Sequence, residues 1–232
     1  MADAKVVIVT GAAGNVGAAL AGLLAARGVR VAAFDRSEAA MVARLGPGEA
    51  AMRLAVADLA DPAQAGAAIA QVAATLGRID GVAATVGTFA MAPVAESTPD
   101  LWERMLRVNL ISTLTVFQGA LPHLRAAGGG SLVAIAAGAA LRAPGGMAAY
   151  AASKSAVLRL VESLSDESRA DRIRVNAVLP GTIDTPQNRA AMPDADPARW
   201  VTPAQVAEVL AFLLSDAASG ITGAALGVPG FG

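Results

Sequence analysis

The sequence predicts an α/β protein with one doubly wound domain, in which a mainly parallel sheet of about seven strands carries helices on both faces. Short apolar stretches rich in β-branched residues alternate with longer helical stretches along the chain, with no linker or repeat between them. The length of 232 residues suits a single domain, residues 1–232, with a substantial core. A cluster of glycines separates the first apolar stretch from the first helical one.

The composition excludes several classes of function. Hydrophobic residues make up 55% of the chain and charged residues 16%, with a formal net charge of −1 and no basic block, so nucleic acid is not an expected partner. The absence of cysteine rules out disulfides and thiolate ligands, and the single histidine, His123, makes a histidine-built metal site implausible. We therefore expect no metal, and we expect a cytoplasmic protein.

An uncharged stretch over residues 6–26 is long enough to suggest a signal peptide or a membrane span. Four glycines, together with Thr10 and Asn15, divide it into a short β-branched run and an alanine- and leucine-rich helix. We therefore interpret it as the start of a soluble domain and expect no membrane association.

The first strand is expected at residues 6–9, which are all apolar and β-branched, and it ends at Gly11. The turn over residues 11–17 reads Gly-Ala-Ala-Gly-Asn-Val-Gly, and a helix is expected at residues 18–27. A strand, a glycine turn and a helix in this order let backbone N–H groups meet a pyrophosphate at a helix N-terminus, as in Rossmann-type dinucleotide-binding domains.

An acidic residue stands at the distance from this turn that dinucleotide binding requires. The second strand, residues 30–34, ends at Asp35, whose carboxylate suits the ribose hydroxyls and repels a 2′-phosphate. Arg36 complicates the assignment, because an arginine there can pair with such a phosphate. Asp58 follows the third strand, where contact with the adenine edge and a plain loop or helix-start role are about equally consistent with its spacing.

The remaining elements continue the alternation. Further strands are expected at residues 51–56, 80–86, 131–136, 173–178 and 224–228, and further helices at residues 62–77, 100–127, 148–170 and 203–215. Ligands of doubly wound sheets bind at the carboxyl ends of the strands, so we expect the residues at those ends to converge. These are Gly11, Asp35, Gly87, Ala137 and Pro180.

Tyr150 and Lys154 are four residues apart in the segment Tyr-Ala-Ala-Ser-Lys, so a helix places both side chains on one face. A free tyrosine has a pKa near ~10, and an adjacent ammonium lowers it toward a range useful for proton transfer. A single tyrosine and lysine at this spacing also occur on ordinary amphipathic helices. Here Tyr150 is the chain's one tyrosine, and a nucleotide-binding turn precedes it.

These residues resemble the short-chain dehydrogenase/reductase family over essentially the whole chain. The resemblance implies an oxidoreductase with Tyr150 as general acid, Lys154 as its pKa modulator and Asn109 as holder of a water that links Lys154 to solvent. It also implies a nicotinamide cofactor gripped after the sixth strand by the Ile183 backbone and the Thr185 side chain. The full set of expected cofactor-binding residues is Gly11, Gly14, Asn15, Val16, Gly17, Asp35, Arg36, Asp58, Leu59, Gly87, Tyr150, Lys154, Pro180, Gly181, Ile183 and Thr185.

The chain departs from the family pattern at three places. Asn15 replaces the usual middle glycine of the turn, Ala-Thr-Val-Gly at residues 84–87 replaces Asn-Asn-Ala-Gly, and Ala137 stands where a serine ordinarily hydrogen-bonds the substrate carbonyl. Together with the run from Asp184 to Pro193, these departures resemble the dihydropteridine reductase-like subgroup, which lacks that serine and uses NADH. An activated, conjugated acceptor spreads incoming charge over a ring, so its reduction does not require a hydroxyl at position 137.

We therefore expect an NAD(P)H-dependent reductase of a small conjugated acceptor, such as a quinonoid pterin, an imine or an enone. NAD is expected rather than NADP, because Asp35 disfavours the 2′-phosphate. The alternatives are an ordinary alcohol dehydrogenase or carbonyl reductase, with Thr85, Thr88 or a water replacing the serine, and a catalytically silent dinucleotide sensor. We expect residues 182–202 to cover the substrate, and the long helices at 100–127 and 148–170 to pair in a homodimer or homotetramer.

Overall fold

The seven strands form one sheet in which every neighbouring pair is parallel. The computed structural model describes residues 4–231. The strands are β1 (Val6–Thr10), β2 (Arg30–Asp35), β3 (Met52–Ala55), β4 (Gly81–Ala84), β5 (Gly130–Ile135), β6 (Ile173–Pro180) and β7 (Ala225–Val228). They lie in the order β3-β2-β1-β4-β5-β6-β7. The predicted fold, a single doubly wound domain, is confirmed.

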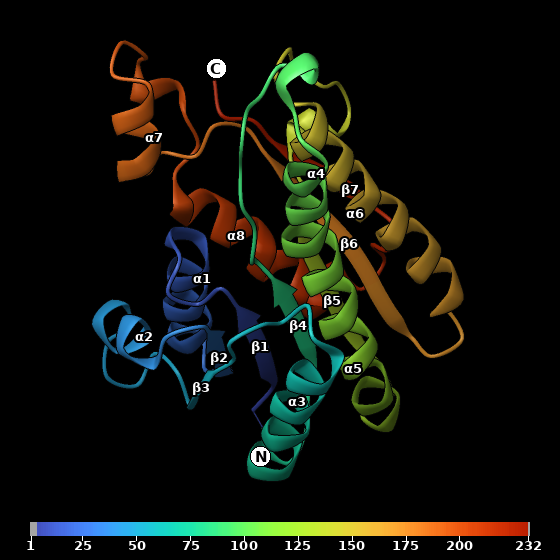
Figure 1. Ribbon diagram of the computed structural model, residues 1–232. Coiled ribbons are helices and arrows are strands. Elements are labelled where there is room, and N and C mark those ends of the chain that lie inside the picture. Colours follow the sequence, from blue (N-terminus) through green and yellow to red (C-terminus); the bar gives the residue numbers. More distant parts are fainter. Residues whose placement is uncertain (1–3, 232) are drawn as a thin grey trace.

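Helices cover both faces of the sheet (Figure 1). They are α1 (Asn15–Ala26), α2 (Glu38–Arg44), α3 (Pro62–Leu76), α4 (Pro99–Leu106), α5 (Ser112–Ala126), α6 (Ala148–Glu167), α7 (Pro186–Ala191) and α8 (Pro203–Leu214). On one face α1 packs against α8, with Leu20 and Leu210 in the core; on the other, Phe117 of α5 and Val157 of α6 are buried. In residues 4–231, no helix is both long and apolar enough to cross a bilayer.

The strand order creates a crevice between β1 and β4. The chain proceeds from β1 outward to β3 and then returns to β4 on the other side of β1, so the connections that leave β1 and β4 diverge at their carboxyl ends. Gly11 lies at this switch point with φ +64°, and a Cβ added to it would lie 3.2 Å from the backbone nitrogen of Val86. The close approach of the two connections thus depends on glycine.

One expected helix is interrupted in the structure, and one helix was not expected. The helix expected over residues 100–127 is α4, a π-helical segment Arg107–Ile111 and α5 in one continuous run. The hydroxyls of Ser112 and Thr113 donate to the carbonyls of Val108 and Asn109, which accommodates the wider turn. In addition, residues 38–44 form α2, capped by the Ser37 hydroxyl, where the sequence analysis expected no helix.

The region after β6 also contains more structure than expected. The segment 182–202 includes the short helix α7, whose first turn is capped by the Thr185 hydroxyl. The helix expected at residues 18–27 begins already at Asn15, and the one expected at 148–170 ends at Glu167.

Candidate active site

The glycine turn brings the start of α1 tightly against β1. A Cβ on Gly17 would lie 2.2 Å from the carbonyl oxygen of Gly11, a distance that no relaxed backbone permits. Gly14 is the N-cap residue of α1 and offers no side chain to its free N–H groups. The first turn of α1 also contains no acidic residue. The helix start therefore has unsatisfied donors and a positive dipole end that suit an anionic pyrophosphate.

Asp35 lies beside this turn at the carboxyl end of β2. Its Oδ2 accepts a hydrogen bond from the backbone nitrogen of Ala13 at 3.0 Å, and its Oδ1 accepts one from that of Arg36 at 2.7 Å. Each carboxylate oxygen retains a free lone pair, so both can accept ribose hydroxyls as well. The Arg36 side chain is exposed.

Asn15 forms a connection that the sequence analysis missed. Its Oδ1 accepts a hydrogen bond from Arg44 Nη2 at 3.1 Å, and its Nδ2 donates to Gln187 Oε1 at 3.2 Å. The side chain that replaces the usual glycine thus joins the turn to α2 and to α7. The positions of Arg44 and Gln187 in the sequence do not predict this contact, because it depends on where two separate loops return to the turn.

Asp58 and Leu59 follow β3 and border the same crevice. Asp58 pairs with Arg107 and accepts a hydrogen bond from the backbone nitrogen of Ala60, and these contacts lower its pKa. The carbonyl of Leu59 accepts a hydrogen bond from the Thr115 hydroxyl. Both residues are therefore held by the continuous run from α4 to α5, which packs on the same face of the sheet as Leu59, and Asp58 is engaged in an ion pair.

The segment after β6 carries Pro180, Gly181, Ile183 and Thr185. A Cβ on Gly181 would lie 2.5 Å from the carbonyl oxygen of Pro229, so the segment and the C-terminal tail run in close contact. The carbonyl of Ile183 accepts a hydrogen bond from Asn188 Nδ2 at 2.8 Å. The Thr185 oxygen accepts one from the Asn188 backbone, which leaves its proton available to an acceptor.

Tyr150 and Lys154 occupy one face of α6, as the spacing predicts. Lys154 is 3% exposed, and its Nζ donates to the carbonyl of Ile135 at the end of β5 at 2.9 Å. Burial lowers the pKa of Lys154 to about 8. Burial also raises the pKa of Tyr150, which differs from the lowering expected from the sequence. The reason is that loss of water disfavours the phenolate, and this effect dominates here. The phenol of the free protein is therefore protonated at neutral pH.

Asn109 lies within the π-helical segment and is 1% exposed. Its Oδ1 accepts a hydrogen bond from the backbone nitrogen of Thr88 at 2.8 Å, and its Nδ2 donates to the Ser153 hydroxyl at 2.9 Å. A Cβ on Gly87 would lie 3.2 Å from Lys154 Nζ and 3.3 Å from Asn109 Oδ1. Lys154, Asn109 and Gly87 therefore meet at one point; Ser153 was not predicted as part of this group.

Ala137 is buried at the end of β5, with an extended backbone. Of the two threonines considered as replacements for a serine, Thr85 donates its hydroxyl proton to the carbonyl of Thr10 at 2.5 Å, so it is already engaged. Thr88 is held by its backbone to Asn109 and is half-buried. Thr88 is thus the threonine with the freer hydroxyl.

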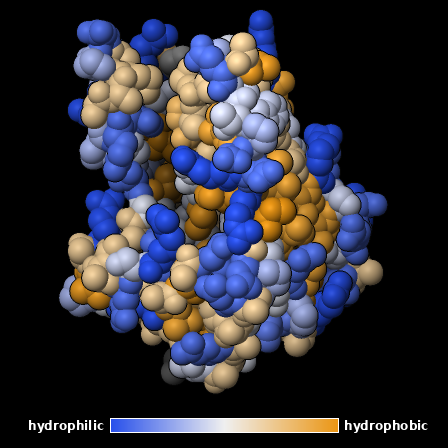
Figure 2. All heavy atoms as spheres, viewed as in Figure 1, coloured by the Kyte–Doolittle hydropathy of each residue, from blue (hydrophilic) through white to orange (hydrophobic). Residues whose placement is uncertain are grey.

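The structure brings the predicted residues to one edge of the sheet. The glycine turn, Asp35, Asp58, Gly87, Tyr150 with Lys154, and Thr185 all follow the carboxyl ends of strands or lie on helices that begin there. Figure 2 shows a hollow between the lobe that carries α7 and the lobe that carries α4. Residues 4–231 hold no group of three acidic, histidine or cysteine side chains that could bind a metal ion.

Comparison with known proteins identifies similar chains. A family model described as short chain dehydrogenase matches residues 5–196. The chain is 35% identical to a D-threitol dehydrogenase of Mycolicibacterium smegmatis, with 98% of this chain and 92% of that one covered. It is 37% identical to a cis-4-hydroxycyclohexanecarboxylate dehydrogenase of Sinomonas cyclohexanicum, with 97% and 95% covered. The structure of a short-chain type dehydrogenase/reductase from Mycobacterium ulcerans superposes with a TM-score of 0.91 at 30% identity, covering 98% of this chain and 89% of that one.

Proposed function

The chain belongs to the short-chain dehydrogenase/reductase family of NAD(P)-dependent oxidoreductases, and from that premise we propose that it reduces a small, conjugated acceptor with NADH. The observation that carries this proposal is the pairing of an intact Tyr150 and Lys154 with an apolar Ala137. The protein has kept the proton donor and lacks the hydroxyl that a simple ketone requires.

The dinucleotide fits the residues at the carboxyl edge. The uncapped start of α1 suits the pyrophosphate, Asp35 suits the adenosine ribose, and Thr185 has a free proton for the carboxamide. When bound, the reduced nicotinamide supplies a hydride. Tyr150 donates a proton to the acceptor, and the Lys154 ammonium stabilises the phenolate that remains. Asn109, beside Lys154, holds the route by which the proton is replaced from solvent.

The absence of a serine at position 137 restricts the chemical class of the acceptor. In carbonyl reduction, negative charge develops on one oxygen, and a positioned donor there is worth a factor of ~10²–10³ in turnover. A quinonoid, imine or enone acceptor distributes that charge over a conjugated system, and protonation by Tyr150 completes the reduction. With such an acceptor, alanine at position 137 lowers turnover only slightly.

We propose NAD rather than NADP as the cofactor. The Asp35 carboxylate lies 3.0 Å from the turn nitrogen of Ala13, where it faces the ribose end of the site and repels a 2′-phosphate. Arg36 is exposed nearby and attracts such a phosphate, so the two side chains compete. Fluorescence titration with both reduced cofactors is the test, and tighter binding of NADPH would overturn the assignment.

We propose that the protein acts as a cytoplasmic homodimer or homotetramer. Figure 2 shows a hydrophobic area over the side of the molecule where α4, α5 and α6 lie in Figure 1. Leu110, Ile111, Leu114 and Leu121 are only half-buried in the single chain. Apolar surface of this kind supports association through these helices. Sedimentation that shows only monomer at micromolar concentration would contradict the proposal.

A second candidate is an ordinary alcohol dehydrogenase or carbonyl reductase. It is favoured by the relatives, whose names describe dehydrogenases of hydroxylated compounds, and by the freer hydroxyl of Thr88. In this function Thr88 replaces the serine, and a Thr88→Val variant then loses most of its ketone activity.

Steady-state oxidation of NADH with a panel of acceptors separates these functions. The panel contains a quinonoid dihydropterin, a quinone, an imine, an enone and a simple ketone, each with wild type and with Ala137→Ser. We expect turnover of conjugated acceptors that Ala137→Ser leaves nearly unchanged, and a gain on the ketone by the serine variant. If the wild type reduces ketones well and serine adds nothing, the second candidate replaces the first. If NADH binds and no acceptor oxidises it, the protein is a sensor.

A further inference from the structure

Two loops beside Tyr150 join into one surface. The loop after β4 and the loop after β5 are connected by a hydrogen bond from the Ala92 backbone nitrogen to the Gly146 carbonyl at 2.8 Å. A Cβ on Gly146 would lie 3.4 Å from the terminal methyl of Met91. Tyr150 follows four residues later on α6. We call residues 85–95 and 136–147 the apolar wall.

The apolar wall exposes large hydrophobic side chains. Phe89 is 51% exposed, Met91 57%, Val94 68% and Leu141 73%. They are half of the eight large hydrophobic side chains found exposed among residues 4–231. Large apolar side chains gathered on a surface cost free energy in water unless a ligand or partner covers them.

Phe89 connects this wall directly to the proton donor. Its ring centroid lies 4.9 Å from that of Tyr150, with the two rings at 80°, an edge-to-face arrangement. This contact contributes to the burial of the phenol. The exposed part of Phe89 therefore lies beside the place where the proton of Tyr150 is delivered.

The side chains of the apolar wall offer few hydrogen bonds to a ligand. Its side chains with N–H or O–H groups are Thr85, Thr88 and Arg142, and Arg142 carries its one charge. Thr85 already donates to Thr10, and the Arg142 side chain is exposed. A polar group of a ligand that meets only these apolar side chains would lose its hydrogen bonds to water without replacement, at a cost of roughly 1–3 kcal/mol for each unsatisfied group.

We infer that the acceptor is an apolar cyclic conjugated ketone of the quinone type, bound with its ring against Phe89, rather than a pterin or a polyol-derived ketone. A pterin has several ring nitrogens and an amino group that would lie unsatisfied against the wall, whereas a quinone ring bears only carbonyl oxygens. The inference rests on the proposed function and names the acceptor of that same site.

The reaction balances with the groups already described. One hydride from the reduced cofactor and one proton from the Tyr150 hydroxyl add to the quinone, giving the hydroquinone and the oxidised cofactor. Tyr150 then regains its proton from solvent. No further oxidant or reductant is needed.

The test compares 2-methyl-1,4-naphthoquinone with a quinonoid dihydropterin and with erythrulose, a small polar ketone, as acceptors for NADH, after subtraction of the rate without protein. We expect kcat/KM for the naphthoquinone to exceed the other two at least about tenfold, which corresponds to ~1.4 kcal/mol. Phe89→Ala is expected to raise KM for the naphthoquinone about tenfold and to change KM for NADH little. Phe89→Leu, which keeps the surface apolar, restores part of the loss.

Phe212→Ala is the matched control, because Phe212 is an exposed phenylalanine (39%) on α8 and has no place in the site. If Phe89→Ala and Phe212→Ala behave alike, or if the dihydropterin is the better acceptor, the inference is wrong and the proposed function stands. Equilibrium dialysis of the naphthoquinone with NAD⁺ present gives a readout without turnover. Phe89-dependent binding without any NADH oxidation would overturn the proposed function and the acceptor role, and would leave Phe89 as a contact of a quinone-binding site; absence of both would also remove that site.

Discussion

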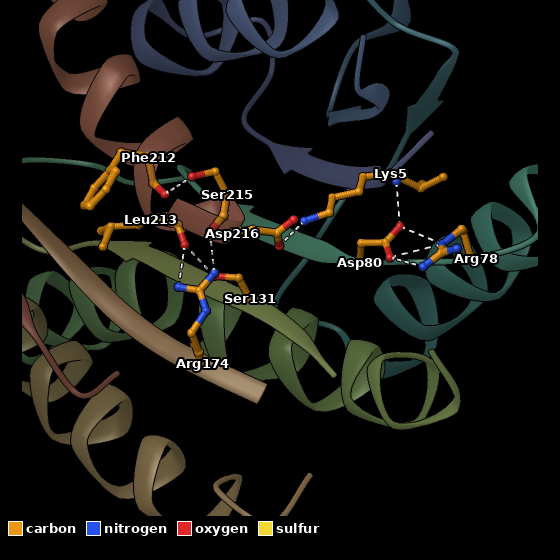
Figure 3. A network of polar contacts seen from close by, with 10 residues as sticks. Lys5, Arg78, Asp80, Ser131, Arg174, Phe212, Leu213, Ser215 and Asp216 are labelled. Carbon is orange, nitrogen blue, oxygen red and sulfur yellow. Dashed lines mark hydrogen bonds and ion pairs between the residues drawn. The ribbon is translucent and has the colours of Figure 1, made fainter. Parts of the chain in front are cut away.

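The two ends of the sheet differ in how their most buried charged groups are paired. At the amino end, Asp80 receives a two-nitrogen contact from Arg78 at 2.5–3.0 Å and a hydrogen bond from the Val6 backbone at 2.8 Å, and Lys5 pairs with Asp216 (Figure 3). Arg174 donates to the carbonyls of Leu213 and Ser215 at 2.7 and 3.0 Å. A hollow of about 260 Å³ lies among these groups.

At the carboxyl end the buried charge is not paired in this way. The ammonium of Lys154 is buried against the backbone carbonyl of Ile135, and the start of α1 offers free N–H groups. Pairing at the amino end holds β1, β4 and α8 in place and leaves few unpaired charged groups with which a ligand could interact. The carboxyl end retains uncompensated groups, and such groups are what a ligand or a reaction can use. The hollow at the amino end is therefore bordered by charged groups that already have partners, namely Lys5, Asp80, Arg174 and Asp216.

The largest expected effect lies in the reaction. Tyr150→Phe removes the proton donor and is expected to lower kcat by a factor of ~10²–10⁴, while NADH binding changes little. Steady-state kinetics with the best acceptor provide the measurement. Asp216→Asn, at the amino end, should leave kcat within about twofold as the control. Equal losses in the two variants would show that the comparison of the two ends is wrong.

Lys154→Met is expected to stabilise the free protein while abolishing turnover. The pKa of Lys154 falls from 10.5 to about 8 on folding, so at pH 7 the buried ammonium costs about 3 kcal/mol at ~1.4 kcal/mol per pKa unit. Loss of the hydrogen bond to Ile135 offsets about 1 kcal/mol of the gain, which leaves roughly 2 kcal/mol.

The sign of the pH dependence follows from the same shift. Between pH 8 and about 10.5 the unfolded chain binds more protons at this lysine than the folded chain does, so wild-type stability rises with pH. Tyr150, whose pKa is raised, opposes this only above about pH 10. Urea unfolding of wild type and Lys154→Met from pH 7 to 9.5 is the measurement. A rise that persists in the methionine variant would assign it to another group.

Gly17→Ala tests how tightly the glycine turn is packed. The added Cβ meets the Gly11 carbonyl at 2.2 Å, so the turn must open, at a cost of roughly 2 kcal/mol or about thirtyfold in NADH affinity. Gly66→Ala is the matched control, because nothing lies within 4 Å of a Cβ at that position of α3. We expect that variant to be more stable by ~0.5–1 kcal/mol and to bind NADH normally. Titration of both variants with NADH tests the expected difference in affinity.

Arg174→Ala is expected to cost roughly 1–2 kcal/mol of stability and to leave the NADH dissociation constant unchanged. The guanidinium binds two carbonyls at the C-terminal end of α8, where a positive charge also meets the helix dipole. Chemical denaturation and NADH titration of the same preparation test both statements. A weakened NADH affinity would connect the amino end to the site, contrary to the comparison.

The smallest effect is expected at the pair of Lys5 and Asp216. Both side chains are solvent-exposed, at 40% and 88%, so the ion pair contributes under about 1 kcal/mol. Asp216→Asn should lower the unfolding midpoint slightly at low salt and hardly at all at 1 M salt. A loss comparable to that of Arg174→Ala would show that the pair is stronger than its exposure indicates.

The fold could be predicted from the sequence, and residues could be proposed for the candidate site, because local patterns determine the conformation of each segment. The β-branched run before Gly11, the turn to Gly17 and the spacing of Tyr150 and Lys154 each specify their own conformation. Contacts between distant loops have no such pattern. The bonds of Asn15 to Arg44 and Gln187, the link of Ser153 to Asn109 and the joining of the apolar wall through Ala92 all depend on how separate connections return to the sheet.

The raised pKa of Tyr150 also depends on contacts that no local sequence pattern indicates. Spacing indicates that an ammonium lies near the phenol, and it does not indicate how much water the surrounding residues exclude. Helix α2 was missed for a different reason: at 7 residues it is too short for its apolar positions, with Met41 alone buried, to show a helical period.

The π-helical segment Arg107–Ile111 sets the rotational phase of everything after it. A wider turn accommodates one residue more than an α-helical turn, and each residue of an α-helix advances the side chains by about 100°. Deleting one residue here would give a regular helix and turn α5 by that angle relative to α4. Asn109 would leave Lys154, and Leu114 and Leu121 would rotate away from the outer face. The position of Asn109 beside Lys154 and the proposed assembly surface therefore depend on the same segment, and a deletion of this kind would change both.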